Sequence, residues 1–403
     1  MTERPPSAAD ALHRRVVLAI STATGGTSAL VSVWFPFLPL FLLQVGARDE
    51  AAAVFWVAVG MSAQGAGRMI GGPLWGVLSD RFGRKKMFVR SVYSAALTSF
   101  VLCVINAPWQ VAIALGLQGL LSGFIPAAVA LTSVSVPDAK VKDALNMVSG
   151  AQYLGSAIGP AVGAVMAIAF GYRGAIFCSG ILLAALATAV IYTVPADTIR
   201  KVERDHAGVA IALAPFRPTL QFALAMLIYF SLFSLATFRS VATPIALKDI
   251  AGSSVTAVTG LAFTLGGIAS ALGIWVLSAP YFAKRRVRTL LAASCVLAAL
   301  GHLLLALSDS IWLFVLAFTL AALLNAAMMP ASNTLIALNV SRDRRGTAFG
   351  IASAAQAIAF MAGPMSAAMF AVISLKTGFV VISVLLLGLA ALIGFFVREP
   401  AMK

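Results

Sequence analysis

Twelve long apolar runs leave almost no part of this 403-residue sequence for a soluble fold. A helix needs about 20 mostly apolar residues to cross a bilayer, and every run has about that length. Hydrophobic residues make up 61% of the chain and charged residues 11%, whereas ordinary soluble domains have roughly 45–50% and about 25%. The sequence therefore predicts an all-α membrane protein with twelve transmembrane helices, at 16–43, 52–78, 87–106, 109–134, 144–169, 174–194, 218–246, 255–280, 289–307, 311–337, 347–373 and 377–397.

The longest connection, 195–217, is rich in charge and lies at the middle of the chain. It predicts two six-helix bundles joined by a linker. The expected parts are an N-terminal tail at 1–15, the first bundle at 16–194, the linker at 195–217, the second bundle at 218–397 and a C-terminal tail at 398–403.

The positions of the 29 lysines and arginines predict the orientation. If both termini are cytoplasmic, 23 of these residues lie in cytoplasmic segments, 4 lie in external loops and 2 lie inside spans. Because Lys and Arg collect on the cytoplasmic side of membrane proteins, we expect a multi-pass protein of the cytoplasmic membrane with both tails and the linker inside. The net charge of +15 then reflects topology, and no nucleic-acid partner is expected.

The two halves repeat one another in sequence. Residues 126–160 align without a gap with residues 330–364, and the matches include the Gly-Pro pairs at 159–160 and 363–364. An even number of spans gives both copies the same orientation. We therefore expect parallel repeats, an arrangement in which transporters hold substrate near the midplane between the halves.

Two motifs contain small residues beside groups that could control movement of the helices. The loop between the second and third spans places a carboxylate among cations, where it accepts charge-assisted hydrogen bonds and acts as a conformational latch; its members are Gly76, Asp80, Arg81, Gly83 and Arg84. The fifth span carries closely spaced small residues around a proline, which soften the helix as a hinge; its members are Gly155, Gly159, Pro160 and Gly163. A simple charge anchor and simple close packing are the alternatives.

The motif in the loop resembles the signature loop of the major facilitator superfamily, G-x-x-x-D-R-x-G-R-K, and matches it completely. The motif in the fifth span is similar to the antiporter motif G-x-x-x-G-P-x-x-G-G, with Ala164 at the last glycine. Together with the repeat, these motifs are most similar to the twelve-span drug:proton antiporter family. The resemblance implies the major facilitator fold and export of small molecules.

Two departures from that family concern proton coupling. Leu115 stands where the family usually carries an arginine in span 4, and span 1 contains no acidic residue. All fourteen acidic residues fall in loops, tails or span ends. His302 in span 9 is the remaining candidate for a buried proton site, and we expect it to be a packed, hydrogen-bonded side chain.

Two arginines, Arg68 and Arg239, lie inside spans of opposite halves with no acid at their depth. Burying such a charge costs at least about 2.5–3.5 kcal/mol. Guanidinium groups bind carboxylates and phosphates through paired hydrogen bonds, so an anionic substrate between the two arginines would supply the missing charge. Bonds to helix carbonyls or water are the alternative for each.

The sequence thus predicts a secondary active transporter that exports or exchanges a carboxylate- or phosphate-bearing solute by alternating access, and a polyspecific drug/proton antiporter is the alternative. A receptor or scaffold without flux would need longer loops. No catalytic triad, metal cluster or nucleotide loop is recognisable, so we expect no enzyme activity, cofactor or metal, and a monomer whose partners are its substrate and the bilayer. Further candidates for the substrate cavity are Trp34, Phe35, Gln64, Gln118, Gln152, Tyr153, Tyr229, Asn325 and Gln356.

Overall fold

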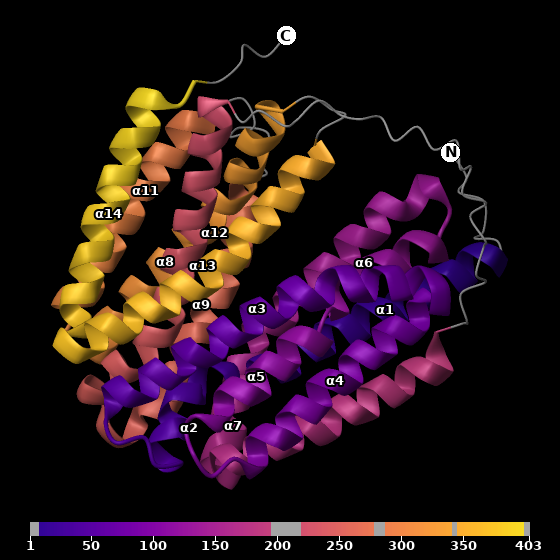
Figure 1. Cartoon of the computed structure of the whole chain (residues 1–403), viewed down its shortest axis with the longest axis horizontal. Helices are drawn as coiled ribbons and strands as arrows, with labels where there is room; N and C mark the ends of the chain where they lie inside the picture. The colour runs from indigo at the N-terminus through magenta and orange to yellow at the C-terminus, as the bar shows by residue number, and fades with distance from the viewer. Residues whose placement is uncertain (1–7, 195–218, 278–286, 341–344, 399–403) are drawn as a thin grey trace, which may run out of the picture.

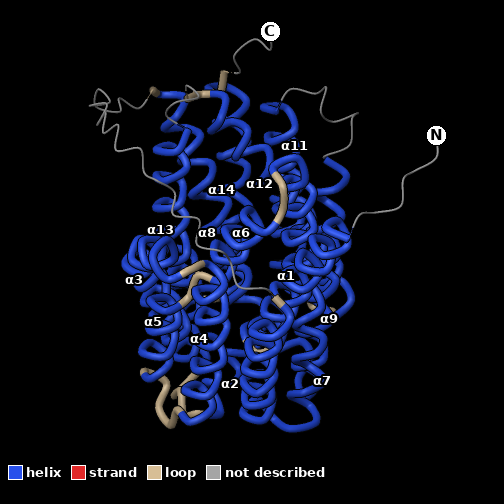
Figure 2. The backbone as a smooth tube through the Cα atoms, turned by 90° about the vertical axis from the view of Figure 1, so that its right-hand side faces the viewer, coloured by secondary structure: helices blue, strands red, loops and turns tan. Residues whose placement is uncertain are grey.

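The computed structural model describes residues 8–194, 219–277, 287–340 and 345–398, and within these ranges it contains helices and loops and no strand (Figures 1 and 2). The N-terminal half comprises α1 (Ala8–Ser32), the 3-10 helix η1 (Phe35–Phe37), α2 (Leu38–Gln44), α3 (Glu50–Phe82), α4 (Arg84–Val104), α5 (Gln110–Leu121), α6 (Phe124–Ser135) and α7 (Asp138–Thr193). The C-terminal half comprises α8 (Leu220–Ala251), η2 (Gly252–Ser254), α9 (Val255–Leu277), α11 (Val287–Leu307), α12 (Ile311–Leu338), α13 (Arg345–Ile373) and α14 (Leu375–Phe396).

The predicted all-α fold with twelve spans agrees with these helices. Eight stretches of the described residues are long and apolar enough to cross a membrane. Two of them, 143–193 and 220–274, each contain two predicted spans, so the eight stretches include ten of the predicted twelve. The long helices α3 and α12 cover the other two.

Several spans begin or are interrupted at places other than those predicted, because glycine and proline interrupt the regular helix there. Spans 5 and 6, both within α7, are two helices that meet at Gly171, whose non-helical backbone with a φ of 71° is favourable for glycine alone. Span 4 is broken between α5 and α6, and the first span begins at Ala8 and contains η1 at Pro36. The predicted linker, 195–217, lies outside the described residues, as do 1–7 and 399–403.

Helix packing follows the same plan in both halves, as expected for a repeat. In the first half, α1 packs mainly on α7, α3 on α5, and α4 on the last part of α7. In the second half, α8 packs on α13, α9 on α12, and α11 on α14. Each half is therefore a bundle of its own, and one cluster of buried apolar side chains runs through both, from Trp34 in the first half to Phe379 in the second.

The two halves lie together at one end of the molecule and diverge toward the other (Figure 1). We call the end at which α1 begins and α14 ends the termini side, and the opposite end, at which α2 ends and α3 begins, the far side. The most extensive contacts between the halves join α3 to α13 and α7 to α9, and η1, α2 and α3 also contact α8. On the far side, the Lys248 ammonium of α8 donates a hydrogen bond of 2.5 Å to the Glu50 carboxylate of α3.

Candidate functional site

One contact between the halves is made by the face of α3 that carries Gly65 and Arg68. A β-carbon at Gly65 would lie 3.3 Å from the carbonyl oxygen of Ala357 in α13, so the two backbones approach closely here. One turn farther, the Arg68 guanidinium carbon lies 5.5 Å from the ring centroid of Phe360 in α13. One turn beyond that, a β-carbon at Gly72 would meet no atom within 4 Å. The helices therefore part just past Arg68, toward the termini side.

The second contact between the halves, α7 with α9, has the same form. Gly260 of α9 faces the Pro160 carbonyl at 3.0 Å, and Gly267 faces the Cα of Ala157 at 2.6 Å, both measured from an ideal β-carbon on the glycine. Two turns farther toward the termini side, a β-carbon at Gly150 would again meet nothing within 4 Å. Both contacts thus end at a similar depth, and beyond that depth the halves are apart.

Aromatic side chains gather at the depth where the halves part. Phe360 of α13 lies 6.3 Å from Phe233 of α8, and Phe233 lies 4.9 Å from Tyr229, measured between ring centroids. Tyr229 is close enough to Tyr153 of α7 for an electrostatic interaction between the two phenols. We call Tyr153, Tyr229, Phe233 and Phe360 the aromatic cluster. Together with Arg68 it draws on both halves and on four helices.

Arg68 and Tyr153 are exposed at this position, whereas Tyr229 is buried. An exposed cation beside aromatic faces binds an acidic or aromatic molecule through hydrogen bonds, charge and stacking. Gln152 and Gln356, the repeat-related amides, are half-buried on α7 and α13. Phe233 and Phe360 were not among the predicted residues, because nothing distinguishes them in sequence from the other 23 phenylalanines.

Arg239 lies elsewhere, inside the C-terminal bundle. Its side chain is 8% exposed, and its guanidinium carbon lies 4.9 Å from the ring centroid of Phe318 in α12. It interacts electrostatically with His302 of α11, whose Nδ1 is 2.8 Å from the carbonyl oxygen of Ala298. The Arg239 Nε and Nη1 atoms have no hydrogen-bond partner among the described residues. The two arginines thus contact different rings, and no contact in the described part of the chain joins them.

Most of the other predicted cavity residues are buried within one half. Gln64 Nε2 donates a hydrogen bond of 2.5 Å to Gln118 Oε1, which links α3 to α5. Asn325 Nδ2 donates to the Leu232 carbonyl at 3.4 Å. Trp34 is buried with Phe35 beside it, at 6.2 Å between ring centroids. The three amides thus hold helices of one half together, whereas Phe35 belongs to η1, which also contacts α8 and α9 of the other half.

The amide pair of Gln64 and Gln118 makes a first prediction. Replacing either residue alone by leucine leaves the other amide buried without a partner, which we expect to cost about 1–3 kcal/mol. The double replacement removes both polar groups and is expected to cost less than the two single costs combined. Melting temperatures of the purified proteins in detergent test this. Additive losses would contradict a direct bond.

Comparison with known proteins agrees with this architecture. The family model described as Major Facilitator Superfamily matches residues 16–286 and 225–403. The chain belongs to the major facilitator superfamily. It is 31% identical over 354 residues to "Multidrug resistance protein MdtG" of Proteus mirabilis (strain HI4320), with 86% of each chain covered. The protein of the same name in Enterobacter lignolyticus (strain SCF1) is 31% identical, with 84% of this chain and 81% of that one covered.

Solved structures of superfamily transporters share the fold at low identity. The nucleoside transporter NupG has a TM-score of 0.75 at 14% identity, and covers 96% of this chain and 100% of its own. The human organic anion transporter MFSD10 (TETRAN) has a TM-score of 0.64 at 18% identity, and covers 97% of this chain and 100% of its own. The chain is therefore a multi-pass secondary transporter and not an enzyme.

The signature loop of the superfamily is compressed in this transporter to a single residue between helices. Gly83 separates α3 from α4 with a φ of 97°, a conformation that favours glycine. Arg84 Nη1 donates to the Ala130 carbonyl of α6 at 3.3 Å, and the Arg81 guanidinium carbon lies 5.6 Å from the ring centroid of Phe82. Gly76 and Asp80 lie on the last turns of α3. The arginine that follows the loop thus ties the start of α4 to α6.

The motif in span 5 lies where α7 crosses α1. A β-carbon on Gly155 or Gly159 would collide with the backbone of α1, at Gly25 and Ala29, and one on Gly163 with the backbone of Val33, just past the end of α1. Pro160 and Ala164 face the other way, toward Gly260 of α9. The small residues of this motif therefore serve the α1 crossing, while its proline and alanine meet the second half of the transporter.

Proposed function

We propose that this transporter exports amphipathic organic molecules from the cytoplasm, and that Arg68 makes it prefer molecules with a negative charge. Substrate is bound between the aromatic cluster and Arg68, at the depth where the two halves part. The chain resides in the cytoplasmic membrane with both termini inside, so the halves of this conformation are apart toward the cytoplasm. It therefore represents the state that takes up substrate.

The observation that carries the proposal is the position of an exposed arginine among aromatic rings at the contact of the two halves. Apolar sites with few polar groups recognise many ligands of similar shape. The relatives that match most of the chain are called multidrug resistance proteins, which supports efflux of such ligands. Export of an anion from a cell with a negative interior is favoured by about 2.3 kcal/mol per charge per 100 mV, so this substrate class needs no membrane carboxylate for coupling.

The experiment uses transport into vesicles with the purified protein, and three fluorescent compounds of similar size that are acidic, neutral or basic. Replacing Arg68 by glutamine removes a charge-assisted bond, and we expect the rate for the acidic compound to fall about tenfold or more. The rate for the neutral compound changes little. Arg68→Lys keeps the charge without the planar fork and is expected to lie between the two.

The matched control is Lys376→Gln, which removes a cation that pairs with Asp309 on the far side. Its transport is expected to equal that of the unchanged protein. Unaltered export of the acidic compound by Arg68→Gln would overturn the charge preference. An equal loss for all three compounds would assign Arg68 to the transport cycle and not to substrate choice.

Polyspecific drug/proton antiport remains the other candidate, because the α7 motif is similar to that of the antiporters. Leu115 is fully buried, and its Cδ1 would lie 2.8 Å from a β-carbon on Gly60, so the position usually held by an arginine is filled here by packing. Proton release on addition of a basic drug to the purified protein favours the antiporter. Its absence favours export driven by the membrane potential.

A further inference from the structure

A separate cavity of about 990 Å³ lies on the far side, between α3 and α13. Its volume is at the upper end of the range of about 300–1,000 Å³ for small-molecule sites. Its walls come from both halves, with the end of α2 and the start of α3 on one side and α8 and α13 on the other. The aromatic cluster and Arg68 do not contribute to it.

One end of the cavity carries four charged groups. The Arg48 Nε donates to Asp49 Oδ2 at 3.1 Å, and Lys248 donates to Glu50 across the halves. Asp49 also caps α3, and its bond from the Ala52 amide, together with Arg48, holds the pKa of that carboxyl below its ordinary value. The rim therefore holds two cations and two carboxylates, and its net charge is zero.

The rest of the cavity wall is apolar and faces outward. Phe55 of α3 is 44% exposed, and Met369 and Val372 of α13 are 67% and 75% exposed. In a membrane-spanning chain these exposed apolar groups meet acyl chains. The charged rim lies at the ends of α2 and α8, which is where the head groups of the bilayer begin. A ligand in this cavity thus has a charged head at the surface and an apolar tail along α3 and α13.

We propose that this cavity binds one phospholipid of the far-side leaflet, with a head group that carries both a phosphate and an N–H-bearing ammonium, as in phosphatidylethanolamine. Arg48 bonds Asp49 through its Nε, which leaves its two terminal nitrogens to donate to the phosphate. The carboxylates of Asp49 and Glu50 accept from the ammonium. A neutral rim gives no advantage to a purely anionic head group.

The lipid would bridge the two halves in the conformation seen here. Phe55 and Arg48 belong to the first half, and Lys248, Met369 and Val372 to the second. When the halves separate on the far side, the head and tail lose one wall of the cavity. The bound lipid therefore stabilises the state in which the halves are closed on this side.

Native mass spectrometry of the delipidated protein tests the proposal. Phosphatidylethanolamine, phosphatidylcholine and phosphatidylglycerol are titrated separately. We expect one saturable site that prefers phosphatidylethanolamine, because the choline head lacks N–H donors and the glycerol head lacks an ammonium. Arg48→Gln and Val372→Trp are each expected to weaken that binding about tenfold, the first by loss of a charge-assisted bond and the second by filling the apolar wall.

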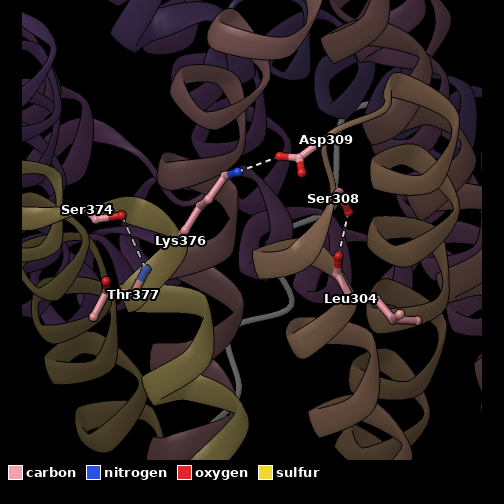
Figure 3. A network of polar contacts seen from close by, with 6 residues as sticks. All are labelled: Leu304, Ser308, Asp309, Ser374, Lys376 and Thr377. Atoms are coloured by element: carbon pink, nitrogen blue, oxygen red, sulfur yellow. Dashed lines mark hydrogen bonds and ion pairs between the residues drawn. The ribbon is translucent and has the colours of Figure 1, made fainter.

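Lys376→Gln is the matched control, since Lys376 also forms a far-side ion pair, of 2.6 Å with Asp309 (Figure 3), which lies outside the cavity. Its lipid binding is expected to match that of the unchanged protein. Because Arg48 and Val372 are exposed, both variants should fold, and their melting temperatures check this. Equal binding of the three lipids, or unchanged phosphatidylethanolamine binding in both variants, overturns the proposal.

Discussion

Replacing Gly159 of α7 by valine is expected to remove most of the folded protein from a detergent extract. A β-carbon at Gly159 would collide with the Ala29 carbonyl oxygen and would lie 2.6 Å from the Ser32 β-carbon, so α1 and α7 would have to separate. Overpacking of this kind typically costs about 1–3 kcal/mol, and a branched side chain against a backbone that has little freedom to shift is at the upper end. The yield and melting temperature after size-exclusion chromatography measure it.

Gly150 on the same helix provides the control. A β-carbon there would meet nothing within 4 Å, while the change in helix propensity from glycine to valine is the same. Gly150→Val is therefore expected to fold normally. If both variants lose equal stability, helix propensity and not the α1 crossing is responsible. If Gly159→Val is as stable as the unchanged protein, the close crossing of α1 and α7 is incorrect.

Replacing Arg239 by methionine is expected to raise the melting temperature and to abolish transport. The guanidinium is buried against Phe318, and two of its nitrogens lack partners in the described part of the chain. A charge at this depth costs about 2.5–3.5 kcal/mol, and methionine of similar length removes that cost. We expect a buried charge that destabilises the conformation seen here to act in another conformation of the transport cycle. Its removal should therefore abolish transport. Thermal melting and vesicle transport measure the two effects.

Arg239→Lys separates charge from shape. It keeps a cation in the same apolar site, so we expect no gain in melting temperature. A lower melting temperature for Arg239→Met would show that the guanidinium stabilises this bundle, and unchanged transport would show that the buried charge has no role in the cycle.

The helices were predictable because a span has a minimum length and lysines and arginines mark its ends. The division between spans 5 and 6 was predictable, since the predicted spans end at 169 and begin at 174 and the helix is interrupted between them, at Gly171. Depth along a helix was also predictable, and both Arg68 and Arg239 lie within spans. The direction of each side chain was not, because a helix that is apolar all round carries no periodic signal.

Because depth along a helix was predictable and side-chain direction was not, the predicted site residues lie within spans but do not all face one another. Arg68 was predicted, and it lies at the contact of the halves; Arg239 was predicted as its partner, but it points into its own bundle against Phe318. Gln64 and Gln118 were predicted as separate cavity residues and bond to each other. Phe233 and Phe360 gain their significance only from the helices that bring them together, which no local pattern in the sequence indicates.

The empty space beside Gly72 and Gly150 makes these two positions suitable for spectroscopic labels. Both accept a side chain without displacing an atom within 4 Å. Across the parting of the halves, Ala354 of α13 and Leu272 of α9 are exposed. Label pairs at 72 and 354, and at 150 and 272, would therefore report the distance between the halves during turnover, one pair beside each of the two main contacts between them.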